Sequence, residues 1–240
     1  AFENFDQLQM TAVSDWVRKR CEEAPITKRI PVRVIENAVD ETIFYKKKGF
    51  QKKWRKEKIP EQKYILNVTS GFSDKKHDLK GGRYLIQTAR ELPEYIFWVA
   101  GNNNVEHPEK IPSNIRLLGN ISDKHELADL YNCADLTVLT SKRETYGMAC
   151  AESLACGTPV VAFLAGGTES IALEEYTEFV EYGNVLMLKE AIYRWVDEKK
   201  TISHKLADAA GKRYAKERMG KEYLQLYKEM LDMENRRKGI

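Results

Sequence analysis

Residues 134–169 read ADLTVLTSKRETYGMACAESLACGTPVVAFLAGGTE, and this stretch decides the fold class. It contains two short β-rich runs, Asp135–Thr140 and Pro159–Phe163, on either side of a helical segment at Met148–Cys156. Both runs are almost continuously apolar instead of alternating, which is typical of strands that are covered on both faces. The stretch therefore predicts a strand–helix–strand unit of a parallel sheet.

The same alternation of strands and helices continues on both sides of this stretch. Further strands are expected at Val32–Ile35, Lys63–Thr69, Tyr95–Ala100, Ile115–Leu118 and Glu178–Tyr182. Helical spacing of apolar residues separates several of them, as at Leu85, Thr88, Ala89 and Leu92. We therefore predict an α/β fold with a doubly wound, Rossmann-like parallel sheet. From Val185 onward the pattern is entirely helical, so an all-helical C-terminal tail is expected, with fraying over Asn235–Ile240.

Composition excludes several classes of protein. Of the 240 residues, 42% are hydrophobic and 31% are charged, which describes a globular protein and excludes a disordered one. The longest apolar stretches are far shorter than the roughly 20 residues that span a bilayer, so a membrane-spanning protein is excluded. The four cysteines have no C-x-x-C spacing, and we expect buried, reduced thiols in a cytoplasmic protein.

Several common catalytic motifs are missing from the sequence. It has no P-loop, no G-x-G-x-x-G, no H-E-x-x-H and no nucleophile elbow. No two aspartates lie two positions apart, so a D-x-D clamp for a metal and a diphosphate is absent, and the four histidines are scattered. These absences disfavour a P-loop ATPase, a dinucleotide-dependent dehydrogenase, a zinc enzyme and a serine hydrolase, and no metal site is assigned.

The net charge of +3 is small, but basic residues gather in one run. Lys46–Lys58 contains eight Lys and Arg residues and one Glu. We favour a solvated linker and helix face for this run. The functional alternative is attraction to an anionic membrane surface or an acidic substrate. Nucleic acid is not expected as a partner, because no recognised DNA- or RNA-binding motif surrounds the run.

Three loops that follow predicted strands carry the polar and glycine residues expected of a ligand site. They are Ser70–Ser73 with Lys80–Gly82, Lys142–Gly147, and Ala165–Glu169. In doubly wound sheets, ligands bind in the crevice outside the carboxyl ends of the strands. The sequence therefore predicts that these loops border one site.

The second loop is the most informative of the three. Glu144 lies in it, Gly147 allows a close backbone approach, and Glu152 follows about one turn into the next helix. The N-terminus of that helix favours an anion. Two carboxylates on either side of an anion site suit a ligand with hydroxyl groups flanking a phosphate, which describes a nucleotide sugar. Taken alone, however, Glu152 is better explained as a solvated or ion-paired helix residue.

The run Glu144–Ala162, followed by Gly166–Glu169, resembles the signature of family 4 glycosyltransferases, which have the GT-B fold. The resemblance extends over nearly the whole chain. Val34–Asp40 is similar to the family's V-I-P-N-G-V-D run near the hinge, and Lys80 with Gly81 is similar to its phosphate-site lysine. Residues 1–31 resemble the last strand and helix of the family's N-terminal domain, where Val13–Trp16 matches V-S-x-W.

The resemblance implies a role for each matching residue. Glu152 would accept hydrogen bonds from the ribose hydroxyls, Glu144 would contact the donor sugar, and Lys80 would neutralise the diphosphate. Glu144 and Lys80 are thus the candidate catalytic residues. Further donor-binding residues are implied at Gly71, Asn120, Ile121, Tyr146, Gly147 and Met148. The structural alternatives are a helix-surface glutamate at 152, a helix-capping glutamate at 144, a solvated lysine at 80 and a Ser122 helix cap in place of a base contact.

Two departures from the family pattern affect these expectations. The family has arginine after the glycine of the first loop, whereas Phe72 follows Gly71 here. The missing positive charge leaves four candidates for compensation, between which the sequence does not choose: Lys75, Lys76, Arg83 and Arg143. Asn37-Ala38 in place of Asn-Gly is a milder change.

The resemblance implies a retaining, metal-independent glycosyltransferase that makes polysaccharide or another glycoconjugate. Its donor would be a UDP- or GDP-sugar, and no cofactor is expected. We divide the chain into a remnant of the N-terminal domain with a hinge (residues 1–31), a nucleotide-sugar-binding domain (32–198) and C-terminal helices (199–240). The last of these helices would pack toward an N-terminal domain that this chain lacks, and without that domain we expect an inactive fragment.

Partners and location follow from the same resemblance. A glycan or lipid-linked acceptor would bind through the N-terminal domain, and the protein would be cytoplasmic, with peripheral contact at the inner face of the membrane as the alternative carried by the basic run. Two other functions stay open. One is a GT-B-fold nucleotide-sugar epimerase, and the other is a non-catalytic Rossmann-like interaction module.

Overall fold

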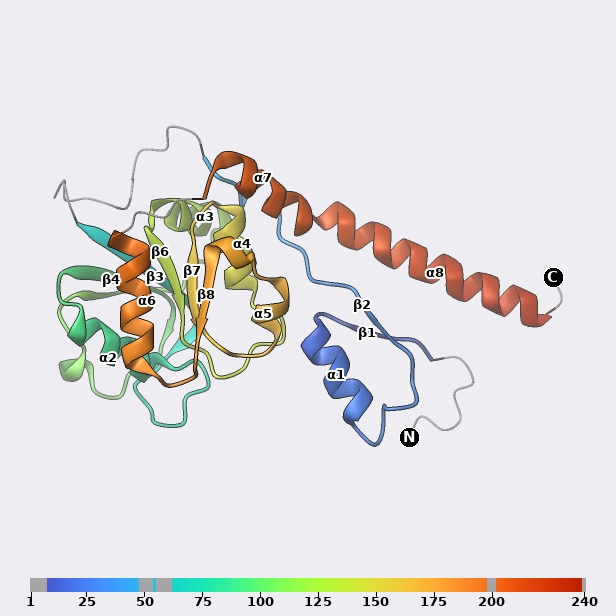
Figure 1. Cartoon of the computed structure of the whole chain (residues 1–240), viewed down its shortest axis with the longest axis horizontal. Coiled ribbons are helices and arrows are strands. Elements are labelled where there is room, and N and C mark those ends of the chain that lie inside the picture. The colour runs from blue at the N-terminus through green and yellow to red at the C-terminus, as the bar shows by residue number, and fades with distance from the viewer. Residues whose placement is uncertain (1–7, 48–53, 55–61, 198–201, 239–240) are drawn as a thin grey trace.

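The computed structural model describes residues 8–47, 54, 62–197 and 202–238. Its main body is a parallel sheet of six strands in the order β5-β4-β3-β6-β7-β8 (Figure 1). The strands are β3 (Lys63–Phe72), β4 (Tyr95–Asn103), β5 (Ile115–Gly119), β6 (Leu136–Leu139), β7 (Val160–Phe163) and β8 (Thr177–Val180). The predicted doubly wound parallel sheet is confirmed.

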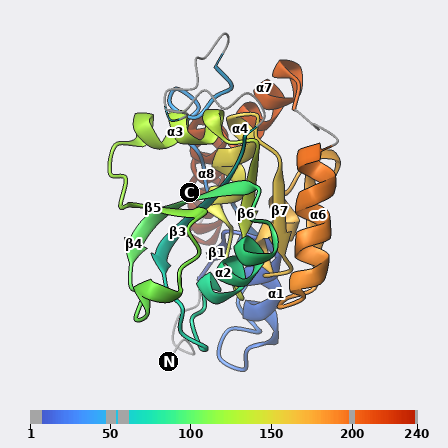
Figure 2. The same cartoon turned by 90° about the vertical axis from the view of Figure 1, so that its left-hand side faces the viewer.

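Helices cover both faces of this sheet (Figure 2). Helices α2 (Gly82–Glu91) and α6 (Val185–Asp197) pack on one face, and α3 (Lys124–Cys133), α4 (Met148–Ala155) and α7 (His204–Arg213) lie on the other. The shorter elements are α5 (Gly167–Ile171) and the 3₁₀ turns Pro108–Lys110 and Glu174–Tyr176. Every residue of β6 and β7 is buried. Continuous apolar runs therefore mark strands that lie between two helical layers.

The strand order creates a switch point next to the central strand. The chain starts at β3, moves outward to β5, and then crosses back to β6 on the other side of β3. The connections after β3 and β6 consequently leave the sheet in opposite directions, and a crevice opens between them. Two of the three predicted ligand loops begin here, because they follow β3 and β6.

The N-terminal part forms a separate unit beside the sheet. Strand β1 (Met10–Ala12) pairs in parallel with β2 (Val32–Val34), and α1 (Asp15–Glu23) connects them. The predicted domain boundary after residue 31 is wrong for β2, because this strand pairs with β1 and does not join the six-stranded sheet. A short apolar strand carries no signal that says which sheet it joins, and here the nearer partner is β1.

The C-terminal helix reaches away from the main sheet and toward this N-terminal unit (Figure 1). Helix α8 (Lys216–Lys238) is tied to β2 by an ion pair between Arg33 and Glu229, with 2.6 Å between N and O. The helix continues to Lys238, so the fraying expected from Asn235 is not seen over the described part. Among the described residues, no helix combines the length and the apolar character needed to cross a membrane.

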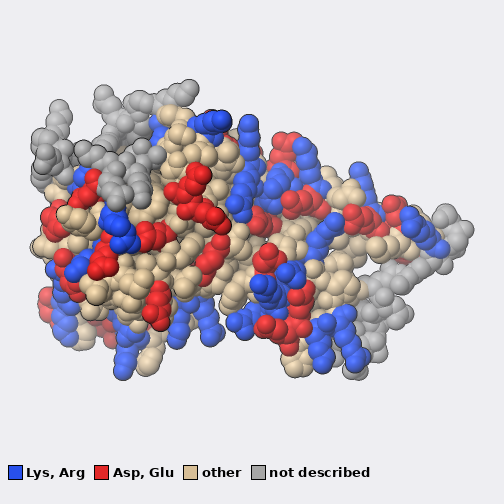
Figure 3. Space-filling model, in the orientation of Figure 1, with Lys and Arg blue, Asp and Glu red and all other residues tan. Residues whose placement is uncertain are grey.

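Most of the basic run Lys46–Lys58 lies outside the described residues. At its start, the Lys46 ammonium donates to the carbonyl oxygen of Ile202 at 2.7 Å, and Lys47 pairs with Asp129. These two lysines thus hold the segment between β2 and β3 against α3 and against Ile202, which precedes α7. Elsewhere basic and acidic side chains are interspersed over the face shown in Figure 3.

All four cysteines lie among the described residues, and none is joined in a disulfide. Cys133, Cys150 and Cys156 are buried, whereas Cys21 is half-buried on α1. Burial raises the pKa of the Cys150 thiol to about 12, which keeps it protonated and unreactive near neutral pH.

Candidate functional site

A cavity of about 270 Å³ lies at the switch point, outside the carboxyl ends of β3 and β6. Its walls come from the end of β3, the start of the α2 loop, the loop after β6 and the first two turns of α4. The lining residues are Asn37, Asn67, Val68, Thr69, Ser70, Lys80, Leu139, Ser141, Glu144, Thr145, Tyr146, Gly147, Met148, Ala149 and Glu152. The fold thus brings together six of the nine predicted site residues.

The other three predicted residues do not line this cavity. Gly71 is a strand residue near the end of β3, where it pairs with Asn102. Asn120 and Ile121 lie between β5 and α3, and Asn120 is exposed. The structural alternative given for this segment was also wrong, because the cap of α3 is Asp123, whose carboxylate accepts from the His125 backbone N–H at 2.8 Å. A base contact at Asn120 and Ile121 stays a prediction.

Lys80 and Glu144, 64 positions apart in the sequence, form an ion pair in the cavity wall. The Lys80 ammonium lies 2.7 Å from Oε1 of Glu144, and both side chains are partly exposed. The Thr140 hydroxyl donates to the Lys80 carbonyl at 2.9 Å and thereby fixes the lysine's backbone at the end of β6. The structural alternatives, a solvated lysine and a helix-capping glutamate, do not describe these side chains.

Gly81 makes this close approach of α2 to β6 feasible. It has a φ of +69°, and a Cβ at this position would lie 2.1 Å from the Thr140 carbonyl oxygen. Only glycine combines this conformation with this contact at low cost. Lys80 and Gly81 therefore act together. The glycine allows the loop to contact the residue after β6, and this contact positions the Lys80 side chain in the cavity.

The N-terminus of α4 forms the floor between the two carboxylates. Gly147 precedes the helix with a φ of +89°, and a Cβ there would meet the Thr168 hydroxyl at 2.4 Å. Met148 and Ala149 open the helix and line the cavity, and the first N–H groups of a helix have no partner within it. This end of the cavity therefore attracts an anion.

The third predicted loop, Ala165–Glu169, supports the second loop and does not line the cavity. The Gly167 backbone N–H donates to the Glu144 carbonyl at 2.8 Å, and the Glu144 N–H donates to Ala165 at 2.9 Å. The Glu169 carboxylate accepts from the backbone N–H groups of Ala165 and Gly166 at 2.8 Å. The glycines of this loop thus serve packing: a Cβ on Gly167 would lie 2.1 Å from the Thr145 carbonyl oxygen.

The N-terminus of α1 also contacts the second and third loops, and these contacts were not predicted. The buried Ser14 hydroxyl donates to the Thr145 carbonyl at 2.6 Å, and the Trp16 ring lies so close to Gly166 that a Cβ there would be 2.6 Å from it. Both side chains, Ser14 and Trp16, belong to the V-S-x-W match, so the sequence identified the residues but not their contacts. Their spatial partners, however, lie about 130 to 150 positions further along the chain.

Glu152 projects from α4 toward the cavity and is largely withdrawn from water. Oε2 of its carboxylate accepts a hydrogen bond from the Tyr131 hydroxyl at 3.0 Å. Burial raises the pKa of Glu152 to about 7, while the Tyr131 hydrogen bond and the charge of Lys124 act in the opposite direction. It is therefore a partly buried, hydrogen-bonded carboxylate and not a helix-surface glutamate, in contrast to the structural alternative.

None of the four basic residues proposed to replace the family's arginine lines the cavity. Lys75 pairs with Glu106 at 2.9 Å, and the Arg83 guanidinium lies over the Tyr84 ring, 4.4 Å from its centroid. Lys75 and Arg83 are thus occupied elsewhere. Within the part of the chain that the structure describes, no three His, Cys, Asp or Glu side chains gather as a metal site would require.

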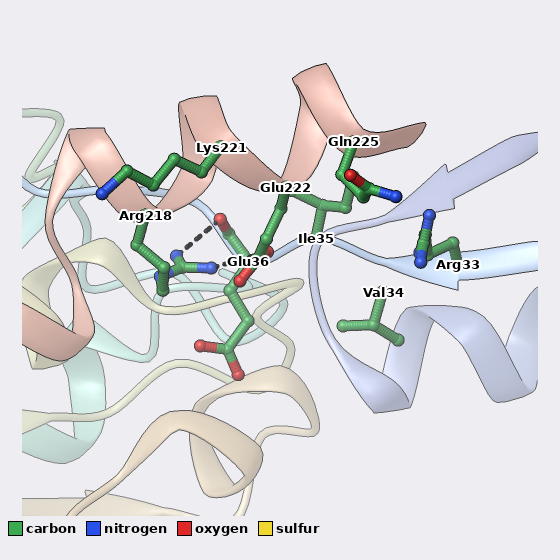
Figure 4. Close-up of a pocket in the computed structure, with 8 residues that line it drawn as sticks. All are labelled: Arg33, Val34, Ile35, Glu36, Arg218, Lys221, Glu222 and Gln225. Atoms are coloured by element: carbon green, nitrogen blue, oxygen red, sulfur yellow. Dashed lines mark hydrogen bonds and ion pairs between the residues drawn. The ribbon is translucent and has the colours of Figure 1, made fainter. Parts of the chain in front are cut away.

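A second cavity, of about 600 Å³, lies between α8 and the connector that follows β2 (Figure 4). The Arg218 guanidinium pairs with Glu222 at 2.9 Å and donates to the carbonyl oxygens of Glu36 and Asn37 at 2.9 and 3.2 Å. Its lining includes none of the predicted site residues. Arg218 here fastens the connector to α8, so this region is a structural junction.

The parallel sheet, the cavity at its switch point and the N-terminus of α4 together define a doubly wound, Rossmann-like domain. A family model described as glycosyl transferases group 1 matches residues 50–216, more than half of the chain. The chain therefore belongs to the glycosyl transferases group 1 family, and the resemblance found in the sequence is confirmed.

Individual relatives agree with this assignment. A D-inositol 3-phosphate glycosyltransferase from Xylanimonas cellulosilytica is 29% identical over 160 residues, which cover 59% of this chain and 36% of that enzyme. The chain thus spans only about a third of this curated relative.

Solved structures share the fold. A sucrose-phosphate synthase from Thermosynechococcus elongatus superposes with a TM-score of 0.75 at 20% identity, covering 94% of this chain and 59% of that one. The Anabaena protein HepE, solved in complex with UDP and glucose, gives a TM-score of 0.70 at 18% identity, with coverage of 91% and 62%. At these identities the likeness concerns the fold alone.

Proposed function

We propose that this chain is the donor-binding part of a retaining, metal-independent glycosyltransferase that uses a UDP- or GDP-sugar. The observation that carries the proposal is the switch-point cavity, in which Lys80, Glu144, the α4 N-terminus and Glu152 meet. Ribose hydroxyls would donate to Glu152, the diphosphate would lie over the first N–H groups of α4, and the transferred sugar would contact Glu144. The complex of Anabaena HepE with UDP and glucose supports this class of ligand.

Charge balance supports the same arrangement. Lys80 is neutralised by Glu144, with 2.7 Å between the ammonium and the carboxylate oxygen. An entering diphosphate would compete for the ammonium and leave the carboxylate free to accept from sugar hydroxyls. When the bond between the anomeric carbon and the phosphate oxygen breaks, negative charge grows on the diphosphate, and Lys80 with the α4 N-terminus would stabilise it. This preorganised positive end would take the place of a divalent ion.

The acceptor side of the reaction is assigned to a part of the protein outside this chain. The chain covers 36% of a curated relative and 59% of a solved one. The proposed acceptor, a glycan or a lipid-linked glycan, would bind to that other part and meet the donor at the cavity. Transfer requires both reactants to be held together, so we propose that this fragment binds donor without turning it over. We also propose that the protein is cytoplasmic and that Lys46–Lys58 contacts the membrane.

Titration calorimetry of UDP- and GDP-sugars against the purified chain tests this proposal. Glu152→Ala should weaken binding by about 1.5–3 kcal/mol, the range for hydrogen bonds to a charged group. Glu217→Ala, on the exposed surface of α8, is the matched control and should leave binding unchanged. Equal affinity of the parent and Glu152→Ala would refute the ribose assignment, and a failure of every donor to bind would favour the interaction module.

Product analysis addresses the epimerase alternative. It requires the enzyme with its N-terminal part, incubated with the donor that calorimetry identifies and with candidate acceptors. Formation of a glycoside supports the transferase, whereas a free epimerised sugar supports the epimerase. Retention of the anomeric configuration is read from the same product by NMR, and an inverted product would contradict that part of the proposal.

A further inference from the structure

Tyr131 is a buried tyrosine that contacts Glu152, a residue of the proposed donor site. It lies on α3, its side chain is 0% exposed, and its hydroxyl donates to Oε2 of Glu152 at 3.0 Å. The ring of Phe44 packs edge-on against its ring at 6.2 Å between centroids, and its carbonyl accepts from the Thr158 hydroxyl at 2.7 Å. Both the ring and the backbone of Tyr131 are thus fixed, and with them the position of its hydroxyl.

This contact is important because two ribose hydroxyls need hydrogen-bond acceptors on the Glu152 carboxylate. An ionised carboxylate only accepts hydrogen bonds, and its two oxygens offer about four acceptor positions. The Tyr131 hydroxyl occupies one of these on Oε2. The remainder can serve two ribose hydroxyls, provided that the group is an anion and does not rotate. A protonated Glu152 would lose acceptor capacity and gain a competing O–H donor.

We propose that Tyr131 is a positioning residue for donor recognition: its hydroxyl holds Oε2 of Glu152 and keeps this carboxylate ionised, so that it accepts from both ribose hydroxyls. The inference rests on the proposed function and adds a residue outside the matched motifs. Donor affinity should consequently depend on pH near neutrality.

The electrostatic surroundings of Glu152 give the direction of this dependence. Burial raises the pKa of Glu152 to about 7, and the Tyr131 hydroxyl and the Lys124 ammonium, both on α3, oppose the rise. The Cys156 thiol, directly after the end of α4, is a neighbouring ionisable group, and the Lys80–Glu144 pair lines the same cavity. Donor affinity should therefore increase as the pH passes through about 7. Removal of the Tyr131 hydroxyl should move this midpoint upward.

The experiment is a calorimetric titration of the chain with UDP-glucose and GDP-glucose between pH 5.5 and 8.5. Both phosphates of these probes are esterified, so neither gains a proton in this range. Tyr131→Phe should shift the midpoint up by about one pH unit and weaken binding about tenfold at pH 6.5, with a smaller loss at pH 8.5. Tyr95→Phe is the matched control, because it removes a tyrosine hydroxyl that donates to a carboxylate, Asp197, at 3.1 Å on the opposite face. It should leave the profile unchanged.

Glu152→Gln separates failure of this inference from failure of the proposed function. If Glu152→Gln binds both probes as the parent does, the ribose assignment itself is wrong. If Glu152→Gln weakens binding and flattens the pH profile, while Tyr131→Phe keeps the parent's midpoint, the positioning role is refuted. In the Glu152→Gln background, Tyr131→Phe should leave the flat pH profile flat.

If Tyr131→Phe does not fold, a measurement on the parent protein tests the inference instead. Carbon-13 NMR of the Glu152 carboxyl should give a titration midpoint near 7, and bound UDP-glucose or GDP-glucose should lower it. A midpoint near the ordinary glutamate value, or one that neither donor moves, would overturn the inference.

Discussion

Glu152→Gln should make the folded protein more stable at pH 8 and leave it nearly unchanged at pH 5. The carboxyl has a pKa of about 7 in the fold and 4.5 as an ordinary glutamate, chiefly because burial disfavours the anion. An acid whose pKa is raised by folding stabilises the fold fully below the ordinary value. That stability is lost as the pH rises through the folded value. Glutamine keeps an oxygen acceptor for the Tyr131 hydroxyl and never ionises.

The expected magnitude follows from the interval between the two pKa values. At about 1.4 kcal/mol for each pH unit, ionisation of Glu152 destabilises the fold by about 3 kcal/mol between pH 5 and pH 8. The free energy of unfolding of Glu152→Gln should therefore exceed that of the parent by about 2–3 kcal/mol at pH 8, and by less than about 1 kcal/mol at pH 5. For a domain whose total stability is about 5–15 kcal/mol, this is a large cost at one position.

Urea unfolding at four pH values, followed by circular dichroism, measures this difference. Subtraction of the parent at each pH removes the contribution of the other titrating groups. Glu217→Gln is the control: this exposed carboxylate pairs with Lys221 at 2.7 Å, which lowers its pKa, so its difference should stay flat between pH 5 and pH 8. A constant difference for Glu152→Gln over the same range would refute the reasoning that burial governs this group.

Three further outcomes are expected. Lys80→Ala should weaken binding of UDP-glucose, or of GDP-glucose if that is the donor, and spare the free nucleoside, because the lysine addresses phosphate charge; equal losses for both in calorimetry would contradict this. Donor binding should survive EDTA, since positive charge is supplied by Lys80 and the α4 N-terminus, and strict dependence on a divalent ion would contradict that account. Gly81→Ala should lower the free energy of unfolding by about 1–3 kcal/mol in urea, because its φ is +69° and its Cβ would strike the Thr140 carbonyl. Gly220→Ala, at a position with open space inside α8, is the control and should cause no loss, whereas an unchanged stability of Gly81→Ala would be inconsistent with strain.

The fold class was predictable from the sequence because each buried strand carries its own signal. Runs such as Val160–Phe163 are apolar at every position, which is typical of a strand between two helical layers. Helices and strands therefore emerged in the right order, together with a family signature that named Lys80, Glu144 and Glu152. Local sequence also pointed to Gly147 as a position of close backbone approach, and this glycine has a positive φ in the structure.

Contacts between distant positions needed the tertiary structure. Nothing local to Val32–Val34 says that it pairs with Met10–Ala12 and not with the main sheet, since an apolar strand satisfies its hydrogen bonds equally well in either. Likewise, the hydrogen bond from Ser14 to Thr145 spans 131 positions, and neither residue carries a pattern that points to the other.

The chemistry of the site shows the same division. The sequence by itself determined which side chains are available: a lysine beside a glycine, a glutamate in a loop and another one turn into a helix. Only the folded chain decided their state, because the Lys80–Glu144 ion pair and the hydrogen bond from Tyr131 to Glu152 join separate elements. Burial is a property of the whole packing, and it is burial that moves the Glu152 carboxyl from an ordinary glutamate to a group that titrates near pH 7.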